Sequence, residues 1–150
     1  MSSIRDQIVD AIVVTLNTGR PAAVPEFERL KTIAINLESL PTAMVYHSVE
    51  MVEPASNRVS PLTKRTLTLV IELRTAEPEP DKSLDPALIW ITARLNNKRI
   101  VDGSLVELSH EALEQAIRWR VAARENPHMA VTVELEIPYT TRATNQEAMS

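Results

Sequence analysis

Residues 66–74 alternate between apolar and mostly polar side chains, a period of two that indicates an extended strand with two different faces. The first set is entirely apolar and consists of Leu67, Leu69, Ile71 and Leu73. The second set consists of Thr66, Thr68, Val70, Glu72 and Arg74. A strand with one apolar and one mostly polar face is typical of an antiparallel sheet covered on one side only. This segment therefore constrains the fold to one that contains such a sheet.

Two further segments show the same alternation. In residues 131–139 the apolar face is Val131, Val133, Leu135, Ile137 and Tyr139, and the polar face is Thr132, Glu134 and Glu136. In residues 43–52 one face holds Val45, His47, Val49 and Met51, and the other holds Met44 and Tyr46. Both segments are predicted strands, and residues 30–36 are a weaker third candidate.

Residues 3–17 are a predicted helix, because apolar residues recur every four positions at Ile4, Ile8, Ile12 and Leu16. Ser2 or Ser3 is its expected N-cap, and Gly19 follows its end. A second helix is expected to start with Asp85 as N-cap and Pro86 at the first position, or one turn earlier with Ser83 as the cap. Its apolar stripe consists of Leu84, Leu88, Ile91 and Leu95, and Asn96 and Asn97 end it.

The segment 109–126 fits two structures. Ala112, Leu113, Ala116, Ile117 and Val121 fit a helix with Ser109 as cap. Ile117, Trp119 and Val121 also alternate as in a strand. Propensity favours the helix, which is the prediction for this segment. Before it, residues 100–108 are expected to be extended, with a turn at Asp102 and Gly103.

Together these elements predict an α+β fold, with a mostly antiparallel sheet of four to five strands and two or three helices on one face. The chain has 150 residues, which favours one domain over residues 1–140. Residues 141–150 show no pattern and are an expected mobile tail.

Composition limits the possible partners. The net charge is −4 and aromatic residues make up 3% of the chain, which disfavours both phosphate binding and base stacking. Cysteine is absent, which fits a reducing compartment such as a cytoplasm. We find no signal peptide and no apolar run long enough to cross a bilayer.

The sequence contains no recognisable catalytic or metal-binding motif. His47, His110 and His128 are isolated, and the two glycines cannot form a glycine-rich phosphate-binding loop. Glu134 and Glu136 lie on one strand face, near the position where Glu72 is expected to pair. They could act as an acid/base pair, but a solvated acidic face is the better interpretation. Trp90 and Trp119 are interpreted as core or interface anchors, and Arg118, Arg120 and Arg124 as part of a mixed-charge surface with Glu114 and Glu125.

The order of these elements resembles that of the tail terminator proteins of long-tailed bacteriophages, the lambda-type minor tail proteins. The resemblance runs from the first helix to Tyr139 and is carried by degenerate motifs. These are Leu40-Pro41, then Val45-Tyr46 with Glu50 and Glu53 after it, the strand 65–74, Leu84-Asp85-Pro86 with Trp90, and Pro138-Tyr139-Thr140.

The resemblance implies a structural role without catalysis or a cofactor. Proteins of this family form a ring, a homohexamer, on the last subunits of the tail tube. The ring stops tube polymerisation and presents a surface to the neck of the filled head. The implied location is the head-proximal end of the tail in the virion, after assembly in the host cytoplasm. The implied partners are further copies of the chain, the tube protein and a neck or connector protein, with DNA passing through without specific binding.

Two sets of residues are candidates for these roles. The long polar loop 53–65 carries Arg58, Lys64 and Arg65, which we expect at an interface with a neighbouring subunit or the tube. Glu72, Glu134 and Glu136 are expected to face a DNA channel, where acidic groups repel phosphate. Three alternatives remain open: a neck or tail completion protein, a small carboxylate-dependent enzyme, and an unrelated binding module.

Overall fold

The computed structural model describes residues 3–30, 41–53, 62–121 and 128–142. Within these ranges the chain forms two helices and seven strands. In chain order they are α1 (Ile4–Asn17), β1 (Phe27–Arg29), β2 (Thr42–Glu53), β3 (Leu62–Thr75), α2 (Pro80–Leu95), β4 (Arg99–Val101), β5 (Glu107–Glu111), β6 (Leu113–Val121) and β7 (Met129–Arg142). Neither helix has the length and hydrophobicity that a membrane-spanning segment requires.

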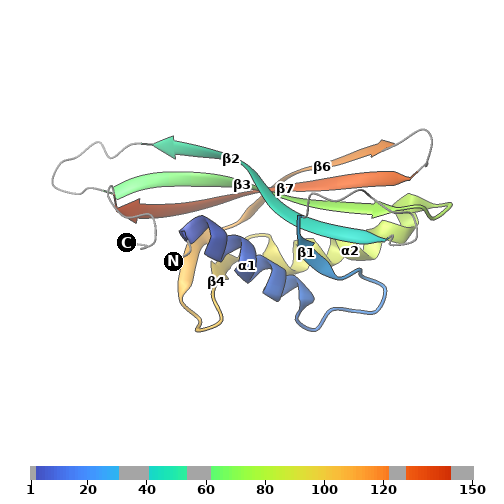
Figure 1. Cartoon of the computed structure of the whole chain (residues 1–150), viewed down its shortest axis with the longest axis horizontal. Coiled ribbons are helices and arrows are strands. Elements are labelled where there is room, and N and C mark those ends of the chain that lie inside the picture. Colours follow the sequence, from blue (N-terminus) through green and yellow to red (C-terminus); the bar gives the residue numbers. More distant parts are fainter. Residues whose placement is uncertain (1–2, 31–40, 54–61, 122–127, 143–150) are drawn as a thin grey trace.

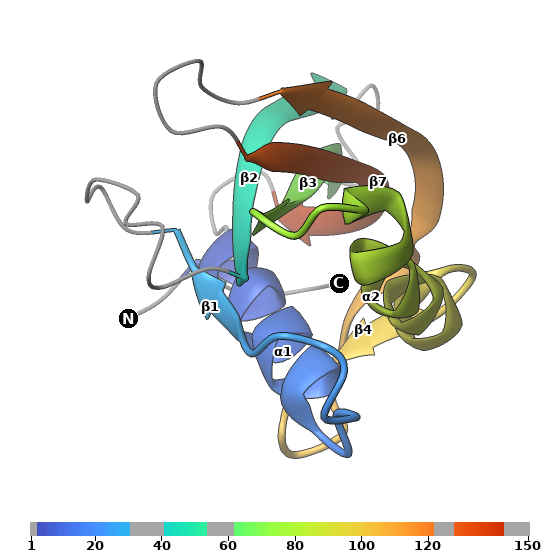
Figure 2. The same ribbon diagram turned by 90° about the vertical axis from the view of Figure 1, so that its right-hand side faces the viewer.

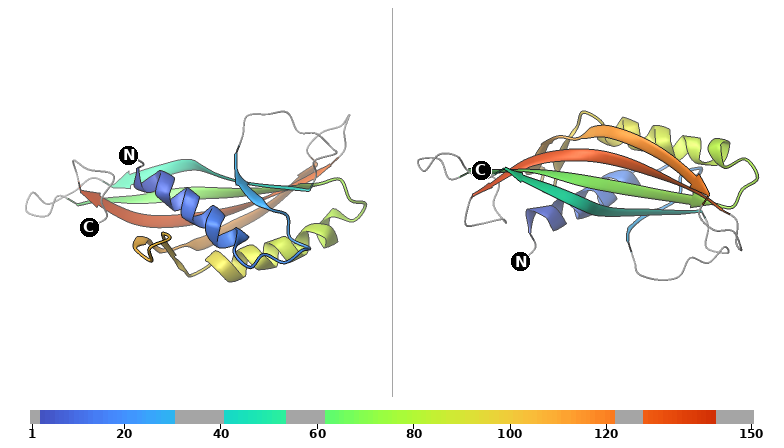
Figure 3. Two further views of the ribbon diagram at one scale, coloured as in Figure 1. Left: turned by 60° about the horizontal axis from the view of Figure 1, so that its bottom comes forward. Right: turned by 90° about the horizontal axis from the view of Figure 1, so that it is seen from above.

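Five strands form one sheet in the order β1-β2-β3-β7-β6, and β4 and β5 pair separately (Figure 1). All neighbours in the main sheet are antiparallel except β1 and β2, which are parallel. The predicted α+β class and largely antiparallel sheet are confirmed. Figure 1 and Figure 3 draw both helices on the same side of this sheet, and Figure 2 shows the strands as a curved layer beside them.

The centre of the sheet is the antiparallel pair β3 and β7. Their register is continuous, from Leu62 opposite Arg142 to Thr75 opposite Met129. The predicted alternation is confirmed in both strands. On the predicted apolar faces the following residues are fully buried: Leu67, Leu69, Ile71, Leu73, Val131, Val133, Leu135 and Ile137. They join residues of α1 and α2 in one apolar core. β7 extends to Arg142, two residues past the predicted end of the domain, while the expected tail at 143–150 lies outside the described residues.

The predicted strand at 43–52 is also confirmed, but the predicted grouping of Val45, His47, Val49 and Met51 on one face is right only for Val45 and His47. The pairing with β3 shifts register between His47 and Glu50, so β2 contains an irregularity of the bulge type. An extra residue reverses which side chains face the core. Glu50 therefore lies opposite the buried Leu67, on the helix side of the sheet, whereas Val49 and Met51 are exposed.

α1 forms as predicted, and the side chain of Ser3 accepts a hydrogen bond from the backbone N–H of Asp6 at 3.1 Å. Asn17 at its end fixes β1. The side-chain amide donates to the carbonyl of Phe27 at 2.8 Å, and its oxygen accepts from the N–H of Phe27 at 2.9 Å. The weaker predicted strand at 30–36 falls almost entirely outside the described residues, and β1 precedes it.

α2 begins earlier than predicted. Three acidic residue–proline steps occur in residues 77–86, and the helix starts at the second, with Glu79 as N-cap and Pro80 at the first position. Pro86, the predicted first residue, lies inside the helix. The predicted stripe is confirmed, because Leu84, Leu88, Ile91 and Leu95 are all buried.

The helix predicted for residues 109–126 is wrong, and the strand alternative describes the segment. Residues 107–111 form β5 and residues 113–121 form β6, which pairs with β7. β7 offers a long edge with unpaired backbone groups, and pairing with it outweighs the weak helical preference of the segment. The expected turn at Asp102 is confirmed: its carboxylate accepts hydrogen bonds from the N–H groups of Ser104 and Val106.

Candidate functional site

The face of the sheet opposite the helices, called here the outer face, brings the predicted channel residues together. In the β3–β7 register Thr68 lies opposite Glu136, and Glu72 lies opposite Thr132. Glu134 lies between them on β7, opposite Val70. Alternation alone predicted that the three carboxylates share this face, and the β3–β7 register sets their spacing along it.

Arginines neutralise much of the acidity of this face. One oxygen of Glu72 accepts hydrogen bonds from Arg74 at 2.8 Å and from Arg120 at 2.9 Å. Arg118 forms an ion pair with Glu134 at 3.4 Å, while Glu136 is exposed. The outer face thus has mixed charge, and Glu72 is held in a structural ion-pair network rather than standing open as a catalytic acid.

Two further groups belong to this network. Arg74 lies 2.7 Å from Nε2 of His128, and a guanidinium group can only donate, so Nε2 is the acceptor. Burial raises the pKa of Tyr46 on β2, and the negative charge of Glu72 raises it further. The ring hydroxyl therefore stays protonated at neutral pH, beside the Glu72 carboxylate.

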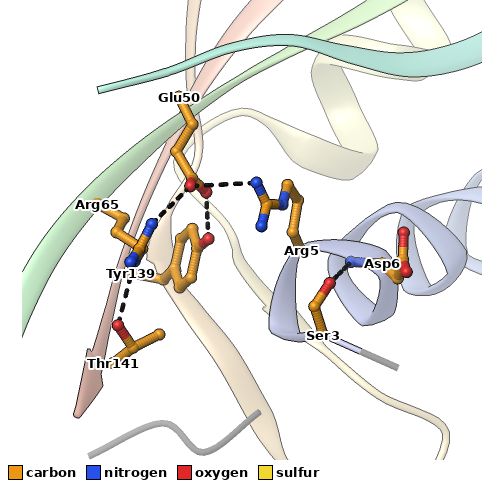
Figure 4. Close-up of polar contacts among 7 residues, drawn as sticks. All are labelled: Ser3, Arg5, Asp6, Glu50, Arg65, Tyr139 and Thr141. Carbon is orange, nitrogen blue, oxygen red and sulfur yellow. Dashed lines mark hydrogen bonds and ion pairs between the residues drawn. The ribbon is translucent and has the colours of Figure 1, made fainter. Parts of the chain in front are cut away.

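A second polar cluster lies on the helix side of the sheet, next to the start of α1 (Figure 4). Glu50 accepts hydrogen bonds from Arg65 at 2.8 Å, from Arg5 at 3.4 Å, and from the hydroxyl of Tyr139. Arg65 also donates to Thr141 at 3.1 Å. Burial raises the pKa of Tyr139, and the hydrogen bond and charge of Glu50 raise it further. The cluster links α1, β2, β3 and β7.

The predicted interface residues have different positions. β3 begins at Leu62, so Lys64 and Arg65 lie in a strand and not in the predicted loop. Lys64 is exposed, whereas Arg65 is largely buried against Glu50 and Thr141. Arg58 lies outside the described residues. A contact of these three residues with a neighbouring subunit stays a prediction.

Two strand edges carry exposed apolar side chains, of which only Trp119 was interpreted from the sequence as a core or interface anchor. On β6 these are Leu113, Ile117, Trp119 and Val121, with exposed fractions between 41% and 69%. On the last part of β2 they are Val49, Met51 and Val52, with exposed fractions between 48% and 67%. The period-two pattern Ile117-Trp119-Val121 was the signal for the first edge, and the helix prediction concealed it.

Other features offer less chemistry. An apolar groove of about 390 Å³ runs between α1 and the β4–β5 turn, with Arg94 in its wall. Arg94 is already engaged, since it donates to the carbonyls of Thr15 and Thr18 at the end of α1 and lies over the ring of Trp90. Among the described residues, no group of three or more His, Cys, Asp or Glu side chains is placed to hold a metal ion.

Comparison with known proteins finds a likeness in structure only. No protein-family model matches the sequence, and no curated protein matches it either. A chain from the solved virion of a native gene transfer agent particle has a similar fold, with a TM-score of 0.53 and 13% sequence identity. The match covers 93% of this chain and 92% of that chain. At this identity the likeness is one of fold, and it extends over nearly the whole of both chains.

Proposed function

We propose that the chain is a structural protein of a phage-like virion that caps the tail tube as a ring, ends tube polymerisation and provides the surface to which the head is joined. The observation that carries the proposal is the likeness in fold, over nearly the full length, to a chain of a gene transfer agent virion. The sequence resemblance to tail terminator proteins adds the position at the end of the tube.

The proposed ring is a homohexamer at the head-proximal end of the tail. It contacts the last ring of tube protein on one side and a neck protein on the other, and DNA passes through it. Two edges of the sheet with exposed apolar side chains suit a protein that works in contact with other subunits, because strand edges and apolar patches are common sites of association. No cofactor has a part in this role.

Electron microscopy of particles that lack this chain tests the proposal. A tail terminator is required to stop the tube, so the mutant should produce tubes of excessive and variable length. Purified chain added to growing tube protein should restore a uniform length. Tubes of normal length in the mutant would contradict the capping role.

A neck or tail completion protein is the second candidate, because the likeness is to a chain of a whole virion particle and agrees with either position. The same micrographs separate the two functions. Tails of normal length that fail to join heads would favour the neck role, whereas overlong tubes favour the terminator.

A further inference from the structure

We propose that neighbouring copies of this chain join edge to edge, with β6 of one copy adding as a strand to the free part of β2 in the next copy. The inference deepens the proposed function, on which it rests, because it names the contact that would build the ring. It rests on the two edges of one sheet, on their direction, and on the side chains that they carry.

The first edge is the outer side of β6. This strand is the last of the five-stranded sheet, and among the described residues its one strand partner is β7. Its beginning is covered, since the side-chain oxygen of Asn96 accepts a hydrogen bond from the N–H of Glu114 at 2.9 Å. Residues 116–121 follow the register shift and present an open edge. Unpaired edges of this kind are templates for pairing with another chain.

The second edge is the last part of β2. β1 pairs with residues 43–45 of β2 and then ends. In the part of the chain that the structure describes, residues 48–53 of β2 have no strand on that side. This stretch is as long as the open stretch of β6.

The direction of the strands permits the contact. β2, β3, β7 and β6 are successive antiparallel neighbours, so β6 runs opposite to β2. When a second copy in the same orientation continues the sheet, its β2 therefore meets β6 of the first copy as an antiparallel neighbour. Such a head-to-tail contact uses different surfaces on the two copies, and it closes into a ring when the rotation between copies allows it.

The contact also requires a stagger between copies, because the two open stretches lie toward opposite ends of the sheet (Figure 1). Through the registers, Ile117 is level with Ile71 of β3, whereas Val52 is level with Arg65. Placing Ile117 opposite Val52 shifts the copies by about six residues, or roughly 20 Å along the strand. A stagger of this kind accompanies strand tilt in closed sheets. It also keeps β6 clear of β1.

The side chains fit this register on both faces. On the helix side, Ile117 meets Val52, and both are exposed in the single chain. On the outer face, Arg118 lies diagonal to Glu53 of the next copy, within reach of long side chains. The side chain of Arg118 is 69% exposed beside Glu134, so it can bridge to a second carboxylate. In the same register Trp119 lies opposite Glu50 and Arg118 lies directly opposite Met51, so the proposed fit rests on the Ile117–Val52 contact and on the Arg118–Glu53 pair.

Cross-linking of the assembled protein tests the contact, and the absence of cysteine makes it unambiguous. Val52→Cys and Ile117→Cys in the same chain, treated with a short thiol cross-linker at the end of the tube, should give a ladder of covalent oligomers up to the full ring. The control combines Ile117→Cys with Val14→Cys, an exposed position on α1 away from both edges, and should give no ladder.

A charge exchange provides a second readout. Arg118→Glu places two negative charges at diagonal positions across the contact and should raise the concentration needed for ring assembly by about tenfold or more. Adding Glu53→Arg in the same chain should restore assembly. Unchanged far-UV circular dichroism of each variant shows that the monomer still folds.

The outcomes separate this inference from the proposed function. A ladder together with rescue by the exchange supports the edge contact. Caps on tubes without a ladder, or with Arg118→Glu assembling normally, overturn the contact and leave the capping role. Overall failure of the native chain to form caps overturns both.

Discussion

Glu50 lies on the helix side of the sheet because β2 gains a residue between His47 and Glu50. Without that irregularity an apolar residue would occupy the position, as the alternation of the sequence predicted. The side chain is 9% exposed and accepts from two arginines and a tyrosine, so its desolvation is offset by charged hydrogen bonds. No pattern in the sequence marks a bulge of this type, which explains why the cluster was not predicted.

Replacing Glu50 tests the value of this cluster. In Glu50→Gln the negative charge is lost, and one of the two oxygens that accept from Arg5, Arg65 and Tyr139 becomes an amide nitrogen, which cannot accept a hydrogen bond. We expect the free energy of unfolding, measured by urea denaturation, to fall by about 2–3 kcal/mol. Arg5→Gln should cost less, about 1 kcal/mol or below, because Arg5 is more exposed and lies at 3.4 Å. Glu136→Gln, at an exposed position on β7, is the control, and an equal loss there would contradict the argument.

Tyr139 makes the free energy of unfolding decrease at alkaline pH. Burial, followed by the hydrogen bond and charge of Glu50, raises the pKa of its hydroxyl above the value near 10 that unfolded tyrosine has. Between these two values the unfolded chain has lost a proton that the folded chain keeps, so stability falls as pH rises. The protonated hydroxyl of Tyr139 thus contributes its full stabilisation below about pH 10. This stabilisation is lost as pH rises through the pKa of Tyr139 in the folded protein.

The free energy of unfolding should therefore decrease above about pH 10, and less steeply in Tyr139→Phe. Urea denaturation at a series of pH values measures both slopes. Ultraviolet absorbance provides a direct check, since the chain has only two tyrosines and burial raises the pKa of both. Titration of Tyr139 at the ordinary tyrosine pKa of about 10 would contradict this prediction.

Among the elements, β3 and β7 were predictable because, over the predicted segments, one face of each carries only apolar core residues while the other carries mostly polar ones, which leaves a clear period of two in the sequence. β6 was not, because its residues alternate as a strand and also satisfy a helical stripe. The segment forms a strand because it pairs with the edge of β7, a contact that the pattern within residues 113–121 does not reveal. The apolar side chains of β6 remain partly exposed, so the burial that normally confirms a strand pattern is absent here.

α2 contains Pro86 in its interior, a position where the hydrogen bonding of a helix disfavours proline. Pro86 lacks the N–H that would bond to the carbonyl of Lys82, and its side chain is exposed, so it contributes little packing in return. Pro86→Ala should raise the free energy of unfolding by about 1–2 kcal/mol after the gain in unfolded-chain entropy is subtracted. Pro80→Ala should change it in the opposite direction, by less than about 1 kcal/mol, because proline suits the first position. Urea denaturation of both variants measures the contrast, and a loss of stability in Pro86→Ala would show that the proline serves packing.

For the molecule as a whole, the two faces of the sheet have separate tasks. The helix side provides the core, and the outer face carries the arginine–carboxylate network of Glu72, Arg74 and Arg120. The sequence indicated a polar outer face correctly but overstated its acidity, because the arginines of β6 were assigned to a helix. Residues Arg118 and Arg120 reach this face only once β6 pairs with β7.

The proposed passage of DNA allows a test of whether the outer face lines the channel. Glu136 is the most suitable residue, because it is exposed on the outer face whereas Glu72 and Glu134 are paired with arginines. If the outer face lines the channel, Glu136→Lys adds an attraction for phosphate at each copy in the ring. DNA release from assembled particles, followed by dye fluorescence, should then slow by several-fold at low salt and approach the normal rate at high salt.

Glu26→Lys, an equal change of charge at an exposed position between α1 and β1, is the matched control and should leave the rate of release unchanged. Normal tube length in both variants would show that capping is intact. A slower release in the control as well would mean that net charge, and not the outer face, governs the effect. Failure of Glu136→Lys to assemble would instead place the outer face at a contact between subunits, since a residue that only faces an aqueous channel has no part in assembly.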